Sequence, residues 1–142
     1  MTYYEDMSPY MYFPDSVPPG INALSVGWLE AGPSHPTGTV PADFLHNLAE
    51  LVDHEAQMQT RGLHSCTLTA DSESCGYPVT VNIRGSEQFL GGAELRVIAE
   101  SGDWLIAPDL IYHYVAKHSY MPPQVFIEAV NAQRVAPLTD VS

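Results

Sequence analysis

The chain has 142 residues, of which 45% are hydrophobic, so it is long enough to fold as one domain around its own core. Seventeen Asp and Glu residues against five Lys and Arg residues give a formal net charge of −12. This charge disfavours binding to nucleic acid or to an anionic membrane surface, and it favours basic proteins, cations or neutral ligands as partners. Solubility alone also accounts for it.

The first twenty residues, MTYYEDMSPYMYFPDSVPPG, are predicted to form an arm rich in aromatic residues and proline. Their acidic residues and prolines are unlike a secretory signal, and no stretch of the sequence is long enough to span a membrane, so a cytoplasmic protein is expected. The arm either covers apolar surface of the domain or presents a surface to a partner. The domain itself is expected to span residues 21–135, with a tail at 136–142.

The first predicted strand lies at residues 22–28, where apolar and small residues alternate with a period of two. A helix follows at 41–57, and its predicted core stripe comprises Phe44, Leu45, Leu48, Leu51 and Val52. His46 and His54 fall outside this stripe and are expected to be exposed. Residues 77–84 alternate again and predict a strand.

The segment at 85–92, GSEQFLGG, is either a hairpin connection or an exposed binding loop around Phe89 and Leu90. Strands are predicted at 93–100 and 104–107, on either side of a turn that contains Gly102.

Two helices complete the chain, at 109–119 and 123–133, and Pro122 and Pro123 separate them. The inward residues are predicted to be Leu110, Ile111, Tyr114 and Val115 in the first, and Val125, Phe126, Ala129 and Val130 in the second. The pattern as a whole predicts an α+β domain. It would consist of an antiparallel sheet of about four strands with three helices packed on one face.

Four residues form a candidate zinc site: the only two cysteines, Cys66 and Cys75, and the histidines His113 and His118. Thiolate and imidazole are the ligands of closed tetrahedral zinc sites. The H-x4-H spacing falls in the usual range, whereas C-x8-C is longer than a tight zinc knuckle. On an ideal helix the two histidines diverge by about 140°. A frayed or tightened last turn before Pro122 is expected to bring them together.

His118 is predicted to project into the apolar stripe between Leu110 and Val115, where a buried imidazole needs a partner. A metal would be one such partner. A histidine bonded to a backbone carbonyl, with both cysteines as thiols, is the alternative, and a disulfide is a third.

His64 is an alternate ligand that can replace either helix histidine, and an open site with only three protein ligands is the other arrangement that the residues allow. Three protein ligands would leave a position for a water molecule, and the candidate general bases for it are Asp71, Glu73 and Glu94. The sequence has no H-E-x-x-H, zinc-deaminase, G-x-S-x-G, P-loop or G-x-G-x-x-G motif.

Three stretches carry a resemblance to a known group of proteins: SVGWL at 25–29, RGLHSC at 61–66 and IYHYVAKHSYMPPQVFIEAV at 111–130. They resemble a family of small uncharacterised bacterial proteins with V-G-W-L and H-Y-V-x-x-H-x-Y-x-P-P-x-x-F motifs. In that family a G-F-H-x-C segment is followed closely by a second cysteine, like a zinc knuckle, whereas here the second cysteine comes only at Cys75. The resemblance implies no activity.

The sequence therefore favours a non-enzymatic interaction or regulatory module that zinc holds together, with a basic protein as the expected partner. A small zinc-dependent hydrolytic enzyme with an open three-ligand site is the alternative. A protein that mimics nucleic acid is a third interpretation, although no row of carboxylates at phosphate-like spacing supports it.

Overall fold

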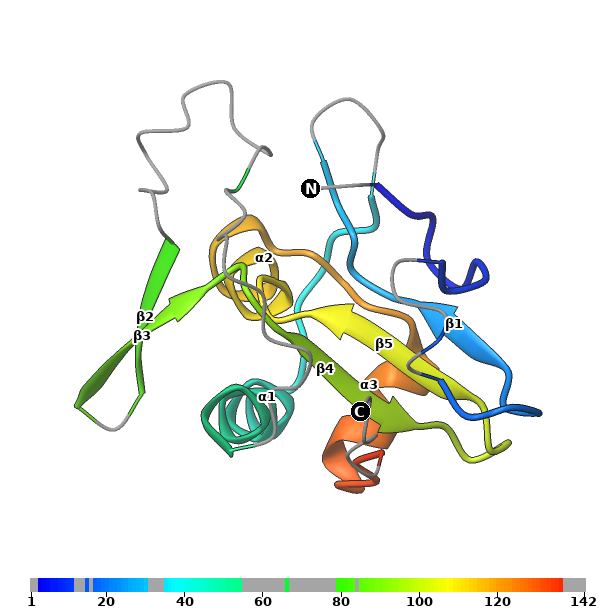
Figure 1. Ribbon diagram of the computed structural model, residues 1–142. Coiled ribbons are helices and arrows are strands. Elements are labelled where there is room, and N and C mark those ends of the chain that lie inside the picture. The colour runs from blue at the N-terminus through cyan, green and yellow to red at the C-terminus, as the bar shows by residue number, and fades with distance from the viewer. Residues whose placement is uncertain are drawn as a thin grey trace.

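The computed structural model describes residues 3–11, 15, 17–30, 35–54, 66, 79–83 and 85–136, apart from the side chain of His54. Its three helices and five strands confirm the α+β class (Figure 1). The elements along the chain are β1 Ala23–Ser25, α1 Ala42–His54, β2 Val79–Ile83, β3 Ser86–Leu90, β4 Glu94–Ile98, β5 Trp104–Pro108, α2 Ile111–His118 and α3 Gln124–Asn131.

The strands form two sheets, and not all of their pairs are antiparallel. The larger sheet has the order β1-β5-β4, with β1 parallel to β5 and β4 antiparallel to it. Parallel pairing is possible because α1 and the hairpin lie between β1 and β5 in the chain, which gives the long connection that parallel strands need. The segment 85–92 was expected to be a connection, but it contains the strand β3, which pairs with β2 in a separate antiparallel hairpin. The expectation was wrong because the sequence did not show that these residues pair along their whole length with Val79–Ile83.

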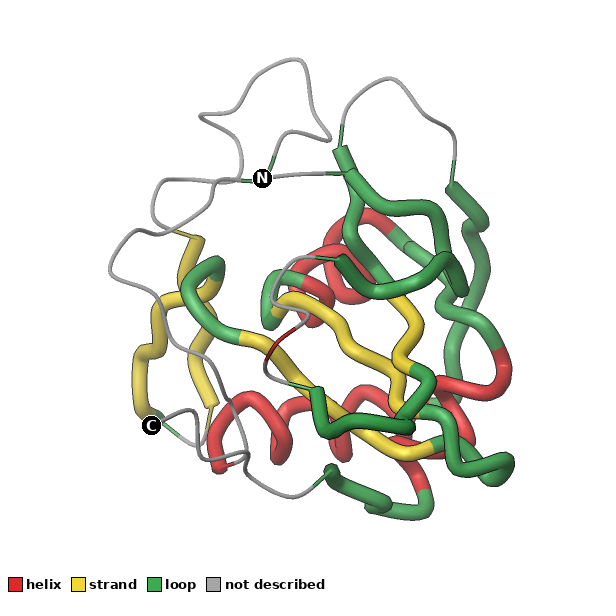
Figure 2. Tube along the Cα trace, turned by 45° about the vertical axis from the view of Figure 1, so that its right-hand side comes forward, coloured by secondary structure: helices red, strands yellow, loops and turns green. Residues whose placement is uncertain are grey.

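The main core lies between one face of the larger sheet and the helices. Strand β4 contributes Leu95 and Val97, and β5 contributes Leu105 and Ala107; all four side chains are buried. Helices α1 and α3 lie side by side in Figures 1 and 2, and the rings of Phe44 and Phe126 meet edge to face with centroids 6.2 Å apart. The predicted α1 stripe is confirmed by the burial of Phe44, Leu48, Leu51 and Val52, with Leu45 partly buried.

The other face of the sheet carries a second, smaller apolar cluster of Tyr10, Trp28 and Ile106. The N-terminal segment lies along β1: Tyr10 N–H donates to Ala23 O at 2.9 Å, and Pro9 forms an antiparallel bridge with Leu24. The described part of the predicted arm therefore covers apolar surface. The domain boundaries at 20/21 and 135/136 stay predictions.

All of residues 25–29 are buried, whereas the alternation predicted that only every second side chain would be. The helices cover one side of this segment, and the N-terminal segment covers the other. Gly27 has a φ of +75°, and a Cβ at this position would lie 2.7 Å from Ile111 Cδ1. A side chain is therefore excluded here, since both the backbone conformation and the contact with α2 require glycine.

Both outer edges of the larger sheet are paired with short segments outside the named strands. Beside β4, Ile98 N–H donates to Arg134 O at 2.7 Å and Ala136 N–H donates to Arg96 O at 2.9 Å. The N-terminal segment covers the β1 edge in the same way. Covered edges leave less backbone exposed for pairing with another chain.

The buried face of α3 is rotated about the helix axis, by about one residue, relative to the face that the sequence predicted. Val125 was predicted to face the core, yet its side chain is 43% exposed, and Ile127 is buried instead. The reason is that α3 packs against both α1 and β4, so its buried arc lies between these two neighbours. The other three predicted core residues of this helix are buried.

Candidate metal centre

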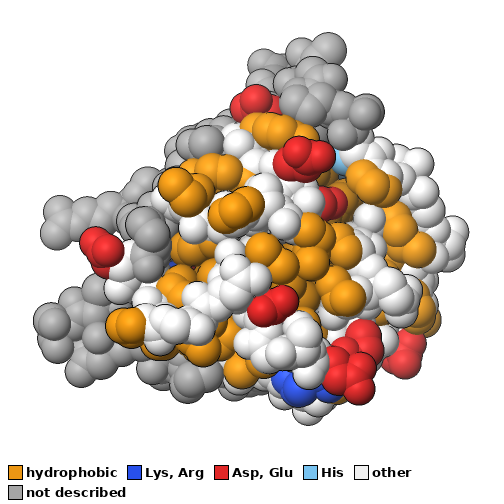
Figure 3. All heavy atoms as spheres, turned by 90° about the vertical axis from the view of Figure 1, so that its right-hand side faces the viewer, with side chains coloured by type: hydrophobic (Ala, Val, Ile, Leu, Met, Phe, Trp, Pro, Cys, Tyr) orange, Lys and Arg blue, Asp and Glu red, His pale blue; other side chains and the backbone are white. Residues whose placement is uncertain are grey.

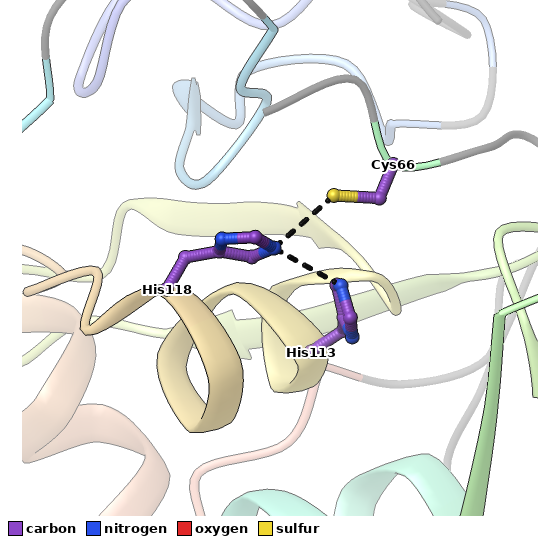
Figure 4. A group of neighbouring side chains, drawn as sticks. All are labelled: Cys66, His113 and His118. Atoms are coloured by element: carbon purple, nitrogen blue, oxygen red, sulfur yellow. Dashed lines mark hydrogen bonds between the residues drawn. The ribbon is translucent and has the colours of Figure 1, made fainter. Parts of the chain in front are cut away.

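Three of the predicted ligands, Cys66, His113 and His118, come together at the end of α2. The Cys66 Sγ atom lies 3.3 Å from His118 Nε2, and His118 Nε2 lies 3.2 Å from His113 Nε2. Figure 4 shows the sulfur and both imidazole rings directed toward a common point. One ligand atom from each residue lies within 4.8 Å of the other two.

The end of α2 explains how two histidines five residues apart can meet. Ser119 adopts a left-handed conformation with a φ of +55°, and its N–H donates to Tyr114 O, five residues back. Tyr120 N–H donates to the same carbonyl oxygen at 3.1 Å. These bonds close a wider turn than the regular i→i−4 ladder does, and a wider turn reduces the divergence of His113 and His118. The expected tightened or frayed turn is therefore a widened one.

The burial of the two histidines is the reverse of the expectation. Cys66 is 1% exposed and His113 is 7% exposed, whereas His118 is only half-buried. His118 was predicted to lie in the middle of the apolar stripe, but the widened turn places it where the chain leaves the helix. The buried imidazole that most needs a partner is therefore His113.

Both imidazoles are held in the neutral form that binds metals. Burial lowers the pKa of His113 to about 4, and the charges of His118 and Lys117 act in the same direction. Burial also lowers the pKa of His118, with a further contribution from the charge of His35. Near pH 7 each ring is therefore neutral, with one nitrogen whose lone pair can bind a metal ion.

The spacing of these atoms is close to that around a tetrahedral zinc ion. Bonds of about 2.0–2.3 Å at tetrahedral angles place neighbouring ligand atoms about 3.3–3.8 Å apart. The separation of 3.3 Å between Cys66 Sγ and His118 Nε2 lies at the lower limit of this range, and the separation of 3.2 Å between the two Nε2 atoms lies just below it. The third pair, Cys66 and His113, lies within 4.8 Å. The donor set therefore fits zinc with only small side-chain movements.

The other candidate residues are not part of the described cluster. Cys75, His64, Asp71 and Glu73 lie outside the described residues. Glu94, the remaining candidate general base, accepts hydrogen bonds from Tyr10 Oη at 2.5 Å and from Arg96 NH2 at 2.7 Å. Its carboxylate is thus engaged in a buried network under the N-terminal segment. The exposed position of His46, whose side chain is 73% accessible, is confirmed.

No pattern in the sequence indicated the residues that hold the end of α2 in place. Tyr120 Oη donates to Asp6 Oδ2 at 2.7 Å, and Gly27 N–H donates to Asp6 Oδ1 at 2.9 Å. Met121 N–H donates to Pro36 O at 2.9 Å, and the ring of His35 lies 6.0 Å from that of Tyr120. Only the folded chain brings these segments together, because Asp6 and Tyr120 are 114 residues apart.

A family model described as "Domain of unknown function (DUF7919)" matches residues 2–131. The expectation of a family without an established function is confirmed at this level. Comparison with curated proteins and with solved structures finds no match. Among the described residues, no helix has the length and apolar character needed to cross a membrane.

Proposed function

The chain belongs to this family of unknown function, and we propose from its metal centre that it is a non-enzymatic interaction or regulatory module held together by zinc. The observation that carries the proposal is the convergence of Cys66, His113 and His118, whose ligand atoms lie within 4.8 Å of one another. The ion would fasten the segment around Cys66 to helix α2, since 46 residues separate Cys66 from His113 in the chain. Metal binding of this kind contributes directly to the free energy of folding.

In the proposed site Cys75 supplies the fourth ligand, and His64 is the alternate for either helix histidine. Four protein ligands leave no position for water, so the ion is structural. The burial of Cys66 and His113 supports this assignment, because structural zinc ions are enclosed by their protein ligands. The H-Y-V-x-x-H segment that holds both histidines is proposed as a signature of the family, together with V-G-W-L.

The proposed partner is a basic protein. The support for it is the formal net charge of −12, which also makes nucleic acid and anionic membranes poor partners. The proposed location is the cytoplasm, where cysteines serve as metal ligands more often than as disulfides.

One observation favours a second function, a zinc-dependent hydrolase with an open site. His118 is only half-buried, so solvent can approach one side of the cluster. A water molecule in the fourth position would then have its pKa lowered toward neutral and could act as a nucleophile. In that case Cys75 would not be a ligand.

Cobalt substitution distinguishes the two proposals, because the sulfur-to-cobalt charge-transfer band grows with the number of thiolate ligands. The protein is first expected to retain about one zinc per chain after dialysis, measured by elemental analysis. In the cobalt form of the closed site, Cys66→Ser and Cys75→Ser should each remove about half of the band. If Cys75→Ser leaves it unchanged and azide shifts the visible spectrum, the site is open and the hydrolase is favoured.

The matched control is His46→Ala, which removes an exposed imidazole from α1 and should leave the metal content unchanged. A zinc content near zero in the unmodified protein, with no cobalt spectrum, would contradict both proposals.

A further inference from the structure

A cavity lies near the candidate metal centre, between the N-terminal segment and the chain that follows β1. Its volume is about 210 Å³. Residues 3–6 form one wall, and Leu29, His35 and Pro36 form the other. His35 and Pro36 join the cavity to the end of α2 through the contacts with Tyr120 and Met121 described above.

Among the described residues, no Lys or Arg lines this cavity, and His35 is the one basic side chain in its wall. The half-buried Asp6 carboxylate accepts hydrogen bonds from Gly27 N–H and Tyr120 Oη, and both of these donors are uncharged. The Glu5 side chain is exposed. Neither carboxylate forms an ion pair with a Lys or Arg of the described residues. Each oxygen of Asp6 therefore keeps a lone-pair direction for a further donor.

Aromatic rings complete the wall on the N-terminal side. Tyr3 and Tyr4 are half-buried, and the Tyr4 ring is fixed edge-on against Trp28 with centroids 5.6 Å apart. The faces of such rings attract cations. Figure 3 looks onto the side of the molecule that carries β1, and acidic side chains stand there directly beside hydrophobic ones.

We propose that this cavity binds a small organic cation, such as a protonated primary amine with a short alkyl chain. Asp6 and Glu5 would accept the ammonium hydrogen bonds, and Tyr3, Tyr4 and Leu29 would contact the alkyl chain. The two carboxylates disfavour anions, and the cavity is too small for a drug-sized ligand. This inference goes beyond the proposed zinc-held module and does not depend on the metal.

The test is an NMR titration of the full chain at pH 8 with n-butylammonium, n-butanol and butyrate, which share an alkyl chain and differ in charge. The expected result is a saturable shift of the Gly27 amide with butylammonium, and at least about tenfold weaker binding of the other two. A tenfold ratio corresponds to one charge-assisted interaction of about 1.4 kcal/mol. Equal binding of butanol, or no saturable shift at Gly27, would overturn the proposal.

Variants of the lining residues test whether butylammonium binds in this cavity. Glu5→Gln changes an exposed side chain and should weaken butylammonium binding about threefold, because a pair in solvent contributes less than 1 kcal/mol. Asp6→Asn should weaken binding by about tenfold, although it also alters the contacts to Gly27 and Tyr120. The matched control is Glu50→Gln, in the other cavity between α1 and β2, and it should change nothing. An equal effect of Glu50→Gln and Glu5→Gln would reject this cavity as the binding site.

Discussion

Two buried polar clusters in this protein differ in whether their side chains find all their hydrogen-bond and charge partners within the cluster. Under the N-terminal segment, Tyr10, Glu94 and Arg96 form a network in which the carboxylate of Glu94 accepts from the uncharged Tyr10 hydroxyl and from the Arg96 guanidinium of opposite charge. At the end of α2, a sulfur and two imidazole nitrogens face each other, and all three are groups that bind metals. The first cluster is complete within the chain, whereas the second has the composition of a site for a cation.

The network under the N-terminal segment is also the more deeply buried of the two. Tyr10, Glu94 and Arg96 are all 5% exposed or less, and the guanidinium lies 5.6 Å from the Tyr10 ring centroid. Burial raises the pKa of Glu94, while the Tyr10 hydrogen bond and the Arg96 charge oppose the rise. A closed network of this kind fixes structure, so position in the core does not by itself indicate function.

The largest expected effect comes from breaking the closed network. Arg96→Met leaves the Glu94 carboxylate buried without its cation and should lower the free energy of unfolding by about 3–5 kcal/mol. Urea denaturation followed by circular dichroism measures the change. The triple variant Tyr10→Phe, Glu94→Leu, Arg96→Met should recover much of the loss, because no charge then remains buried. A small effect of the single variant would mean that water reaches Glu94 and that the network is not closed.

The metal cluster should respond to zinc, whereas the closed network should not. With free zinc at 1,000 times its dissociation constant, binding stabilises the folded protein by about 4 kcal/mol. A chelator, Cys66→Ser or Cys75→Ser should each remove most of this stabilisation, and His46→Ala should have almost no effect. Thermal unfolding with and without added zinc checks the prediction. Equal melting temperatures for all variants would contradict the site.

A second buried carboxyl, Asp109, gives an intermediate case. Burial raises its pKa from 3.8 to about 6, although hydrogen bonds from backbone N–H groups, including that of Gly91, lower it. Between these values the folded protein keeps a proton that the unfolded chain has lost. The contribution of Asp109 to the free energy of unfolding is therefore fully present below about pH 4. It is lost as the pH rises through 6, and the loss amounts to about 2–3 kcal/mol.

The pH dependence of urea unfolding for Asp109→Asn and for the unmodified protein tests this prediction. The asparagine variant should lack the loss of stability between pH 4 and pH 6, and the exposed Glu87→Gln should retain it. Identical profiles for Asp109→Asn and the unmodified protein would show that Asp109 ionises at its ordinary pKa.

The smallest expected effect concerns the hydrogen bond between Tyr120 and Asp6, which links the end of α2 to the N-terminal segment. Tyr120→Phe removes the hydrogen bond to Asp6 and should cost about 1.5 kcal/mol, as expected for a bond to a charged group. Because Tyr120 follows His118 by two residues, zinc affinity measured by competition with a chelator should fall as well. An unchanged zinc affinity would show that α2 positions His118 without help from Asp6.

The sequence by itself determined the α+β class, the three helices and the residue types of the candidate metal centre. Helix α1 was predictable because the core stripe from Phe44 to Val52 follows a period of 3.6 residues, which local backbone geometry imposes. The H-Y-V-x-x-H segment was visible as a pair of possible ligands for the same reason. The parallel pairing of β1 with β5 was not visible, because strand alternation carries no information about the neighbouring strand.

Only the tertiary structure decided which polar residues meet. The sequence did not distinguish Glu94 from the other candidate bases. In the folded chain, however, it accepts a hydrogen bond from Tyr10, which is 84 residues away. The widened end of α2 depends on Ser119 and on contacts with the chain around Pro36, so ideal helix geometry placed His118 too deep in the core. Asp6 gained its role in the same way, since hydrogen bonds between distant residues depend on the packing of the whole chain and leave no periodic pattern in the sequence.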